Sequence, residues 1–286
     1  MESLINLSER LNKVSEKKFN NPYSTIDWPK RIDQKDWYYS PELMSLYGTD
    51  VFKTLSEEQK QKLSLFEAVN FFSLNIHGEK ELIAQLSDRL YKNYPHEVTD
   101  YIHHFLDEEN KHMLWFGSFC MRYAGKVYPN RKINFPREYA QGEEELLFFI
   151  KVLVFEEYVD FFNIKISKDD RVNPIARQIH RQHHMEESRH LSFGREMVKT
   201  ILRQNKDSWD STVIDGIKKY VESYMISTWK EYYNPSMYQD AGLEDAYDLV
   251  DIAWNSQHSR MLREEVSEKC ISFLRSVELI TGEFKV

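Results

Sequence analysis

The stretches EENKH (residues 108–112) and EESRH (residues 186–190) share one pattern: two glutamates, one further residue, a basic residue and a histidine. In each stretch the second glutamate and the histidine are three positions apart. On a helix such a pair lies on one face, one turn apart, where a carboxylate and an imidazole can reach the same metal ion. One copy arises readily by chance, whereas two copies indicate a paired site.

The first copy interrupts an apolar stripe. On a helical wheel, several apolar residues lie within about 40° of Glu109. They are Ile102, Phe105, Leu106, Met113, Phe116 and Cys120. A carboxylate in such a stripe is costly to bury, and metal ligation is one way to keep it charged. A protonated acid and an ion pair are the alternatives.

Long helical segments surround both copies. Glycine and proline are scarce, at 9 and 8 of 286 residues, which favours long helices. The predicted helices cover residues 4–18, 56–91, 95–124, 142–167, 173–204, 210–233 and 243–279. No strand pattern stands out. The chain therefore predicts one all-α domain over residues 1–286, with a four-helix bundle at about 56–204, an N-terminal arm at 1–55 and C-terminal helices at 210–280.

Local signals mark the ends of these helices. Ser56 and Gln59 predict a capping box, and Gly125 can end the second bundle helix in a left-handed conformation. Asn173 followed by Pro174 predicts the start of the fourth. Pro235 and Gly242 are expected to separate the last two helices.

The other two bundle helices are each expected to supply one glutamate. In the first, Glu67 and Glu79 both have apolar neighbours. Glu79 is favoured because it lies nearer the middle of its helix, level with Glu109 in an antiparallel partner. In the third, Glu156 and Glu157 are both flanked by apolar residues, and periodicity does not separate them.

The fourth helix carries additional histidines. His183 lies close to His190 on the helical wheel and is predicted to be a ligand, whereas His180 and His184 are less favoured. The equivalent position in the first copy is Phe105, so the repeat is broken there. The alternative is that His183 and His184 are partly exposed or only support the ligands.

Four glutamates and two histidines form the ligand set of a carboxylate-bridged di-iron or di-manganese centre. Oxygen-rich donors with a few imidazoles suit iron or manganese. The two cysteines, Cys120 and Cys270, are too few for a four-thiolate site or a disulfide framework.

Together these residues resemble the arylamine N-oxygenases related to p-aminobenzoate N-oxygenase, which are non-haem di-iron enzymes on a ferritin-like bundle. The resemblance covers about residues 79–190, and the H-x-x-x-E-x-x-H spacing at 183–190 is its specific part. It also favours Glu156 over Glu157. One departure is Glu108, where the family usually has Asp, which puts the contact made at that position in doubt.

The resemblance implies a ligand set and a chemistry. The implied metal ligands are Glu79, Glu109, His112, Glu156, His183, Glu187 and His190, with no catalytic residue beyond them. Two iron ions, with manganese as an alternative, would use O₂ and an external electron donor to oxidise an aromatic amine to a hydroxylamine, nitroso or nitro product. Glu109, Glu187 and Glu156 would bridge or chelate. His112 and His190 would each hold one iron, with His183 as a further donor to the His190 iron, and a homodimer is implied.

Composition excludes several other functions. A net charge of −8 disfavours nucleic acid as a partner. No apolar run reaches the ~18 residues of a membrane span, and no signal peptide is evident, so we expect a cytoplasmic protein. No glycine pattern predicts a flavin or nicotinamide site. Another di-metal oxidase, an iron-binding protein and a purely structural helical protein are the competing interpretations.

Substrate and radical residues are less clear from sequence. Arg260 and Arg263 could pair with a substrate carboxylate, although a solvated helix face is the simpler interpretation. A radical-forming oxidase would need a tyrosine near the metals, for which Tyr101 and Tyr158 are candidates.

Overall fold

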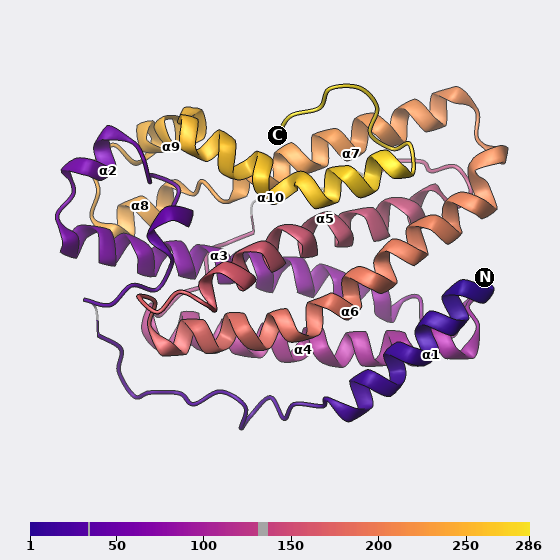
Figure 1. The fold of residues 1–286 in the computed structure, drawn as a ribbon, viewed down its shortest axis with the longest axis horizontal. Helices are drawn as coiled ribbons and strands as arrows, with labels where there is room; N and C mark the ends of the chain where they lie inside the picture. Colours follow the sequence, from indigo (N-terminus) through magenta and orange to yellow (C-terminus); the bar gives the residue numbers. More distant parts are fainter. Residues whose placement is uncertain (34, 131–136) are drawn as a thin grey trace.

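The computed structural model describes residues 1–33, 35–130 and 137–286, and over these ranges it consists of helices and irregular segments without a β-strand (Figure 1). An isolated β-bridge joins Trp37 to Val172. The predicted all-α class is confirmed.

Four long helices form the centre of the molecule. They are α3 (Glu57–Ser87), α4 (His96–Tyr123), α5 (Glu143–Ile166) and α6 (Pro174–Asn205). Helix α3 packs along α4, and α5 packs along α6. The bounds agree with the predicted ranges to within a few residues, except that α3 ends four residues earlier, at Ser87 rather than residue 91.

The predicted end signals act as expected. Ser56 and Gln59 form the capping box of α3. Gly125 follows α4 with φ +67, a conformation that glycine adopts without steric cost. The side chain of Asn173 accepts a hydrogen bond from the backbone N–H of Ile175, at 2.9 Å, and Pro174 occupies the first turn of α6.

Helix α5 is buried on all sides. Helices α6, α7 (Ser211–Glu231) and α10 (Gln257–Ser276) pack around it, and α3 touches it at a few points. A helix in such a position has no polar face, and the buried residues of α5 indeed cover its whole circumference. Polar residues in the middle of α5, such as Glu156, Glu157 and Asn163, are therefore buried and need partners.

The N-terminal region covers the bundle from outside. Helix α1 (Glu2–Lys17) packs on α4 and α6, and the chain then runs back along the bundle as the expected arm (Figure 1). The arm also contains two short helices that were not predicted, η1 (Pro41–Leu43) and α2 (Asp50–Thr54).

The prediction of one helix over residues 243–279 was wrong. The structure has α9 (Ala246–Asn255) and α10, separated by Ser256. Ser256 is extended, with ψ 146, and its side chain accepts a hydrogen bond from the backbone N–H of Ser259 at 3.0 Å, so it caps α10. A short helix, α8 (Pro235–Ala241), was also missed, because Pro235 begins a helix rather than only separating two.

No helix in the described part of the chain is both long enough and apolar enough to cross a lipid bilayer.

Candidate metal centre

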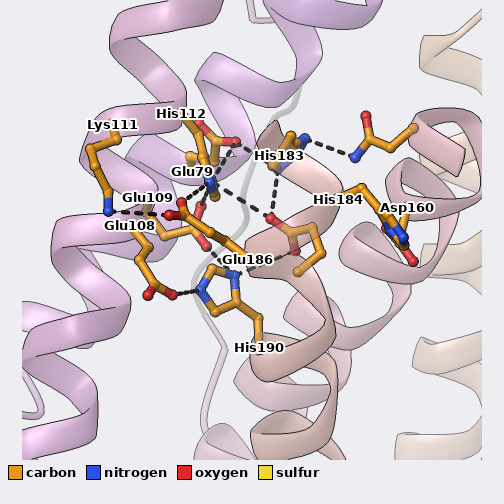
Figure 2. Close-up of polar contacts among 12 residues, drawn as sticks. Glu79, Glu108, Glu109, Lys111, His112, Asp160, His183, His184, Glu186 and His190 are labelled. Carbon is orange, nitrogen blue, oxygen red and sulfur yellow. Dashed lines mark hydrogen bonds and ion pairs between the residues drawn. The ribbon is translucent and has the colours of Figure 1, made fainter. Parts of the chain in front are cut away.

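The seven predicted ligands lie together in the middle of the bundle, in two groups. One group is Glu79, His112 and His183, and the other is Glu109, Glu156, Glu187 and His190. Within each group the donor atoms lie within 4.8 Å of one another, and all seven side chains are buried. Figure 2 shows His112 of α4 and His183 and His190 of α6 pointing toward the glutamates between them, whereas His184 points toward Asp160. His183 lies in the group of His112, so the implied pairing of His183 with the His190 ion was wrong. Two such groups are able to hold two metal ions.

Two glutamates connect the groups. Glu109 places Oε2 at 3.5 Å from His112 Nδ1 and Oε1 at 2.9 Å from His190 Nδ1. Glu187 places Oε1 at 3.6 Å from His112 Nδ1 and Oε2 at 3.4 Å from His190 Nδ1. Each carboxylate therefore presents one oxygen to each histidine, which is the arrangement that a bridging ligand needs.

The donor atoms are buried and lack hydrogen bonds. Within the described ranges of the chain, both oxygens of all four glutamates, Nδ1 of His112 and His190, and Nε2 of His183 have no hydrogen-bond partner. Some pairs are close, such as His183 Nε2 and Glu187 Oε1 at 2.6 Å, but the angles do not suit a hydrogen bond. Buried polar atoms are normally paired, so a convergent set without hydrogen bonds fits metal ions.

The pKa values of two of these glutamates also favour metal binding at this place. Burial raises the pKa of Glu79 well above its usual value, and the charge of Glu109 raises it further. Burial also raises the pKa of Glu156, together with the charges of Glu187 and Glu109. Carboxylates crowded in an apolar interior resist ionisation. Divalent cations at this place would relieve the repulsion among them.

A further glutamate contacts His112 and another contacts His190, each on the side of the imidazole that faces away from the metal groups. His112 Nε2 lies 2.8 Å from Oε2 of Glu186, and His190 Nε2 lies 2.8 Å from Oε2 of Glu108. These contacts leave Nδ1 of each histidine facing the metal groups. Despite the departure from Asp, Glu108 therefore reaches a histidine of the opposite helix.

The basic residue of each copy completes this arrangement. Lys111 Nζ lies 3.3 Å from Glu186 Oε1, and Arg189 donates to Glu108 Oε1 at 2.6 Å. Both basic side chains are buried. The first glutamate of each motif thus pairs with the histidine and the basic residue of the other motif. The sequence analysis missed this reciprocity, although the repeat itself was its signal.

Asn163 of α5 was also missed. Its Nδ2 lies 2.9 Å from His183 Nδ1, and its Oδ1 lies 2.8 Å from His180 Nδ1. If the carboxamide of Asn163 rotates by 180°, its oxygen instead of its nitrogen faces His183. Asn163 can therefore form a hydrogen bond with Nδ1 of His183 whether or not that atom carries a proton. No spacing rule links residue 163 to the motif at 183–190.

The less favoured histidines lie outside both metal groups. His180 packs against Phe71 and Phe72, and burial, with the charge of His183, lowers its pKa to about 3, so it is neutral. His184 is half-buried and pairs with Asp160 at 2.5 Å.

The alternative glutamates have other partners. Glu157 forms an ion pair with Arg195. Glu67 accepts a hydrogen bond from the backbone N–H of Ser45 at 3.0 Å and another from its hydroxyl, and burial raises the pKa of Glu67 to about 7. Neither glutamate lies in a metal group.

The candidate substrate arginines do not reach the centre. Arg263 is buried, donates to the hydroxyl of Tyr233 at 2.9 Å and stacks on Trp254 with its guanidinium 4.0 Å from the ring centroid. Arg260 is exposed. For the radical alternative, Tyr101 is buried against Phe193 and lies close enough to His190 and Glu108 for their charges to act on it. Tyr158 is buried against Trp229.

Comparison with known proteins places these features in context. The family model described as P-aminobenzoate N-oxygenase AurF matches residues 4–278. Uncharacterized proteins of Mycobacterium tuberculosis and Mycobacterium bovis are 25% identical over 190 residues, which is 63% of this chain. That match spans only 56% of the length of these curated relatives.

Solved structures show the same fold. Two variants of an R2-like ligand-binding oxidase with an anaerobically reconstituted Mn/Fe cofactor superimpose with TM-scores of 0.53 and 0.54. They are 18% and 17% identical, and the match covers 96% of this chain and 93% of theirs. At this identity the likeness concerns the ferritin-like fold.

Proposed function

The chain belongs to the P-aminobenzoate N-oxygenase AurF family, and we propose that it is a di-metal oxidoreductase that N-oxygenates an aromatic amine. The observation that carries the proposal is the pair of buried carboxylate–histidine groups whose donor atoms converge without hydrogen bonds among the described residues. The family supports the reaction class, and the oxidation level of the product is left to experiment.

We assign the seven residues as the metal ligands, with Glu109 and Glu187 as the bridging pair. His112 and His183 would serve one ion together with Glu79, and His190 and Glu156 the other. The oxygen-rich donor set suits iron or manganese, and the R2-like structures were reconstituted with Mn and Fe. Held by these residues and reduced by an external donor, two such ions would supply the electrons for the activation of O₂.

The surrounding residues hold the ligands in place. Glu186 and Glu108 accept from Nε2 of the two histidines and so keep Nδ1 directed inward. Lys111 and Arg189 balance the charge of these two glutamates. Aromatic side chains surround the groups and exclude water from the interior. Among them is Phe116, whose ring centroid lies 5.0 Å from that of His183.

The test combines metal analysis with turnover. The protein is loaded anaerobically with Fe²⁺, desalted, and analysed for iron, and we expect about two ions per chain. The reduced protein is then exposed to O₂ with aniline as the probe amine, and N-oxygenated products are measured. A His183→Ala variant is expected to lose oxygenation while remaining folded by circular dichroism.

Two results would contradict the proposal. Many iron ions per chain would indicate storage. Two ions, rapid O₂ consumption and no N-oxygenated product from a panel of arylamines would indicate a different di-metal oxidase. The homodimer, the electron donor and the cytoplasmic location remain predictions for solution and cell experiments.

A further inference from the structure

Three sides of the bundle are closed around the metal groups. Helices α3 and α4 pack closely along their length, as do α5 and α6, and α1 lies across α4 and α6. Helices α3 and α5, in contrast, touch each other at few points. The seam between α3 and α5 is therefore the part of the bundle wall with the least direct packing.

Two surface hollows lie over this seam and meet at Gly78 and Glu81. One lies between α3 and the segments around Tyr128 and Asn234. The other lies between α3, α5 and Tyr224 of α7. Each has a cavity volume of about 30 Å³, which is room for about one water molecule, so an aromatic molecule can enter only when a side chain moves.

Phe155 separates the second hollow from the interior. Its ring lies so close to Gly78 that a Cβ added there would be 2.5 Å from Cζ of the ring. Only a residue without a side chain allows this approach. Phe155 lines the hollow and is 8% exposed, so the tip of its ring fills the seam against Gly78.

The same contact lies directly beside the metal groups. Gly78 precedes Glu79 on α3, and Phe155 precedes Glu156 on α5. These glutamates are the only ligands that α3 and α5 supply. The floor of the hollow is thus formed by the residues that directly precede a metal ligand on each of the two helices.

The lining of the second hollow indicates what can enter. Phe148, Phe155 and Tyr224 offer aromatic faces, and Leu82 and Val152 offer apolar surface. The charged residues at the rim, Lys151 and Glu81, pair with each other at 3.4 Å. Such a site favours an uncharged aromatic molecule over an ion.

We infer that a neutral aromatic amine reaches the metal groups through this hollow, and that the ring of Phe155 must turn aside to admit it. This inference rests on the proposed function for the identity of the amine. The position of the access route rests on the geometry of Gly78 and Phe155 alone, and it can be tested without turnover.

The primary test uses Phe155→Ala with Phe162→Ala as the matched control. Phe162 is a buried phenylalanine two turns further along α5, which lines neither hollow. Each protein is loaded with Fe²⁺ under anaerobic conditions, and the rate at which 2,2′-bipyridine, an uncharged aromatic chelator, removes the iron is recorded. We expect removal to be about tenfold faster in Phe155→Ala than in the control, because the closing ring is absent.

A second variant tests the route by blocking it. Gln85 is half-buried in the wall of the hollow, so Gln85→Trp should fold while filling the space, whereas Gln85→Ala should leave it open. We expect Gln85→Trp to slow iron removal and to reduce oxidation of 4-aminobiphenyl more than that of aniline.

The outcomes separate the two proposals. Faster iron removal in Phe155→Ala supports the route even if no arylamine is oxidised, in which case the proposed function fails alone. Equal removal rates in Phe155→Ala and Phe162→Ala, or in Gln85→Trp and Gln85→Ala, would overturn the route even if aniline is oxidised.

Discussion

Glu186 of α6 lies 2.8 Å from His112 of α4, between Oε2 and Nε2, on the side of the imidazole that faces away from the metal groups. Glu108 and His190 repeat this contact in the opposite direction between the same two helices. Each helix therefore supplies both a ligand and the support for the ligand of its neighbour (Figure 2). Ligation and helix pairing are coupled through these buried contacts.

We expect Glu186→Gln to weaken metal binding by about 10- to 100-fold, because a neutral amide stabilises the inward-facing tautomer less well than a carboxylate does. The measurement is a competition titration with a chromophoric chelator. Glu264→Gln, at an exposed position of α10, is the control and should bind like the parent. Equal metal affinities in the two variants would show that Glu186 does not support the ligand His112.

The neighbouring residues Glu156 and Glu157 provide a matched pair. Glu156→Gln should reduce metal affinity at least ~10-fold, since its carboxylate lies in a metal group. Glu157→Gln should leave metal content unchanged and lower the free energy of unfolding by about 1–3 kcal/mol, because Arg195 loses its partner. Iron analysis and urea unfolding of both variants check this, and the reverse pattern would exchange the two assignments.

Asn163→Ala should leave His180 and His183 without a partner at Nδ1. We expect a loss of about 1–3 kcal/mol in the free energy of unfolding and roughly tenfold weaker metal binding. Asn163→Asp offers an acceptor to Nδ1 of His183, which carries the proton when Nε2 binds the metal, and should restore most of the affinity. Asn75→Ala, which removes another fully buried asparagine, is the control. If Asn75→Ala weakens metal binding equally, the effect is one of general stability.

Glu67 should make the stability of the metal-free protein depend on pH. Burial raises its pKa from 4.5 to about 7 in the folded state, so the folded chain holds a proton that the unfolded chain releases. This contribution to stability is complete below pH 4.5, is lost as the pH rises to about 7, and amounts to about 3 kcal/mol.

The Glu67→Gln variant should not show this loss. Its urea midpoint is expected to equal that of the parent near pH 5 and to exceed it at pH 8. Parallel pH dependences of the two proteins would mean that Glu67 remains ionised when buried.

The helices and most of the ligands follow from local patterns. The spacing of Glu109 and His112, and of Glu187 and His190, places each pair on one helix face wherever the helix lies. Capping signals at Ser56 and at Asn173 are equally local, and they gave the starts of α3 and α6 correctly.

Local patterns could not identify the metal ligand on helix α5. Because it is apolar all round, periodicity could not separate Glu156 from Glu157. The packing of α5 decides the matter, since it turns Glu156 toward the metal groups and Glu157 toward Arg195. The start of α10 at Ser256 is, by contrast, marked by a local capping contact with Ser259.

Contacts between helices required the assembled bundle. Lys111 with Glu186, Asn163 with His183, and Phe155 against Gly78 each join residues far apart in the chain. The period of the α-helix determines which residues share a face from the amino-acid order alone. Which faces meet, and at what level, depends on how the helices rotate and slide to bury their side chains, and this is a property of the whole fold.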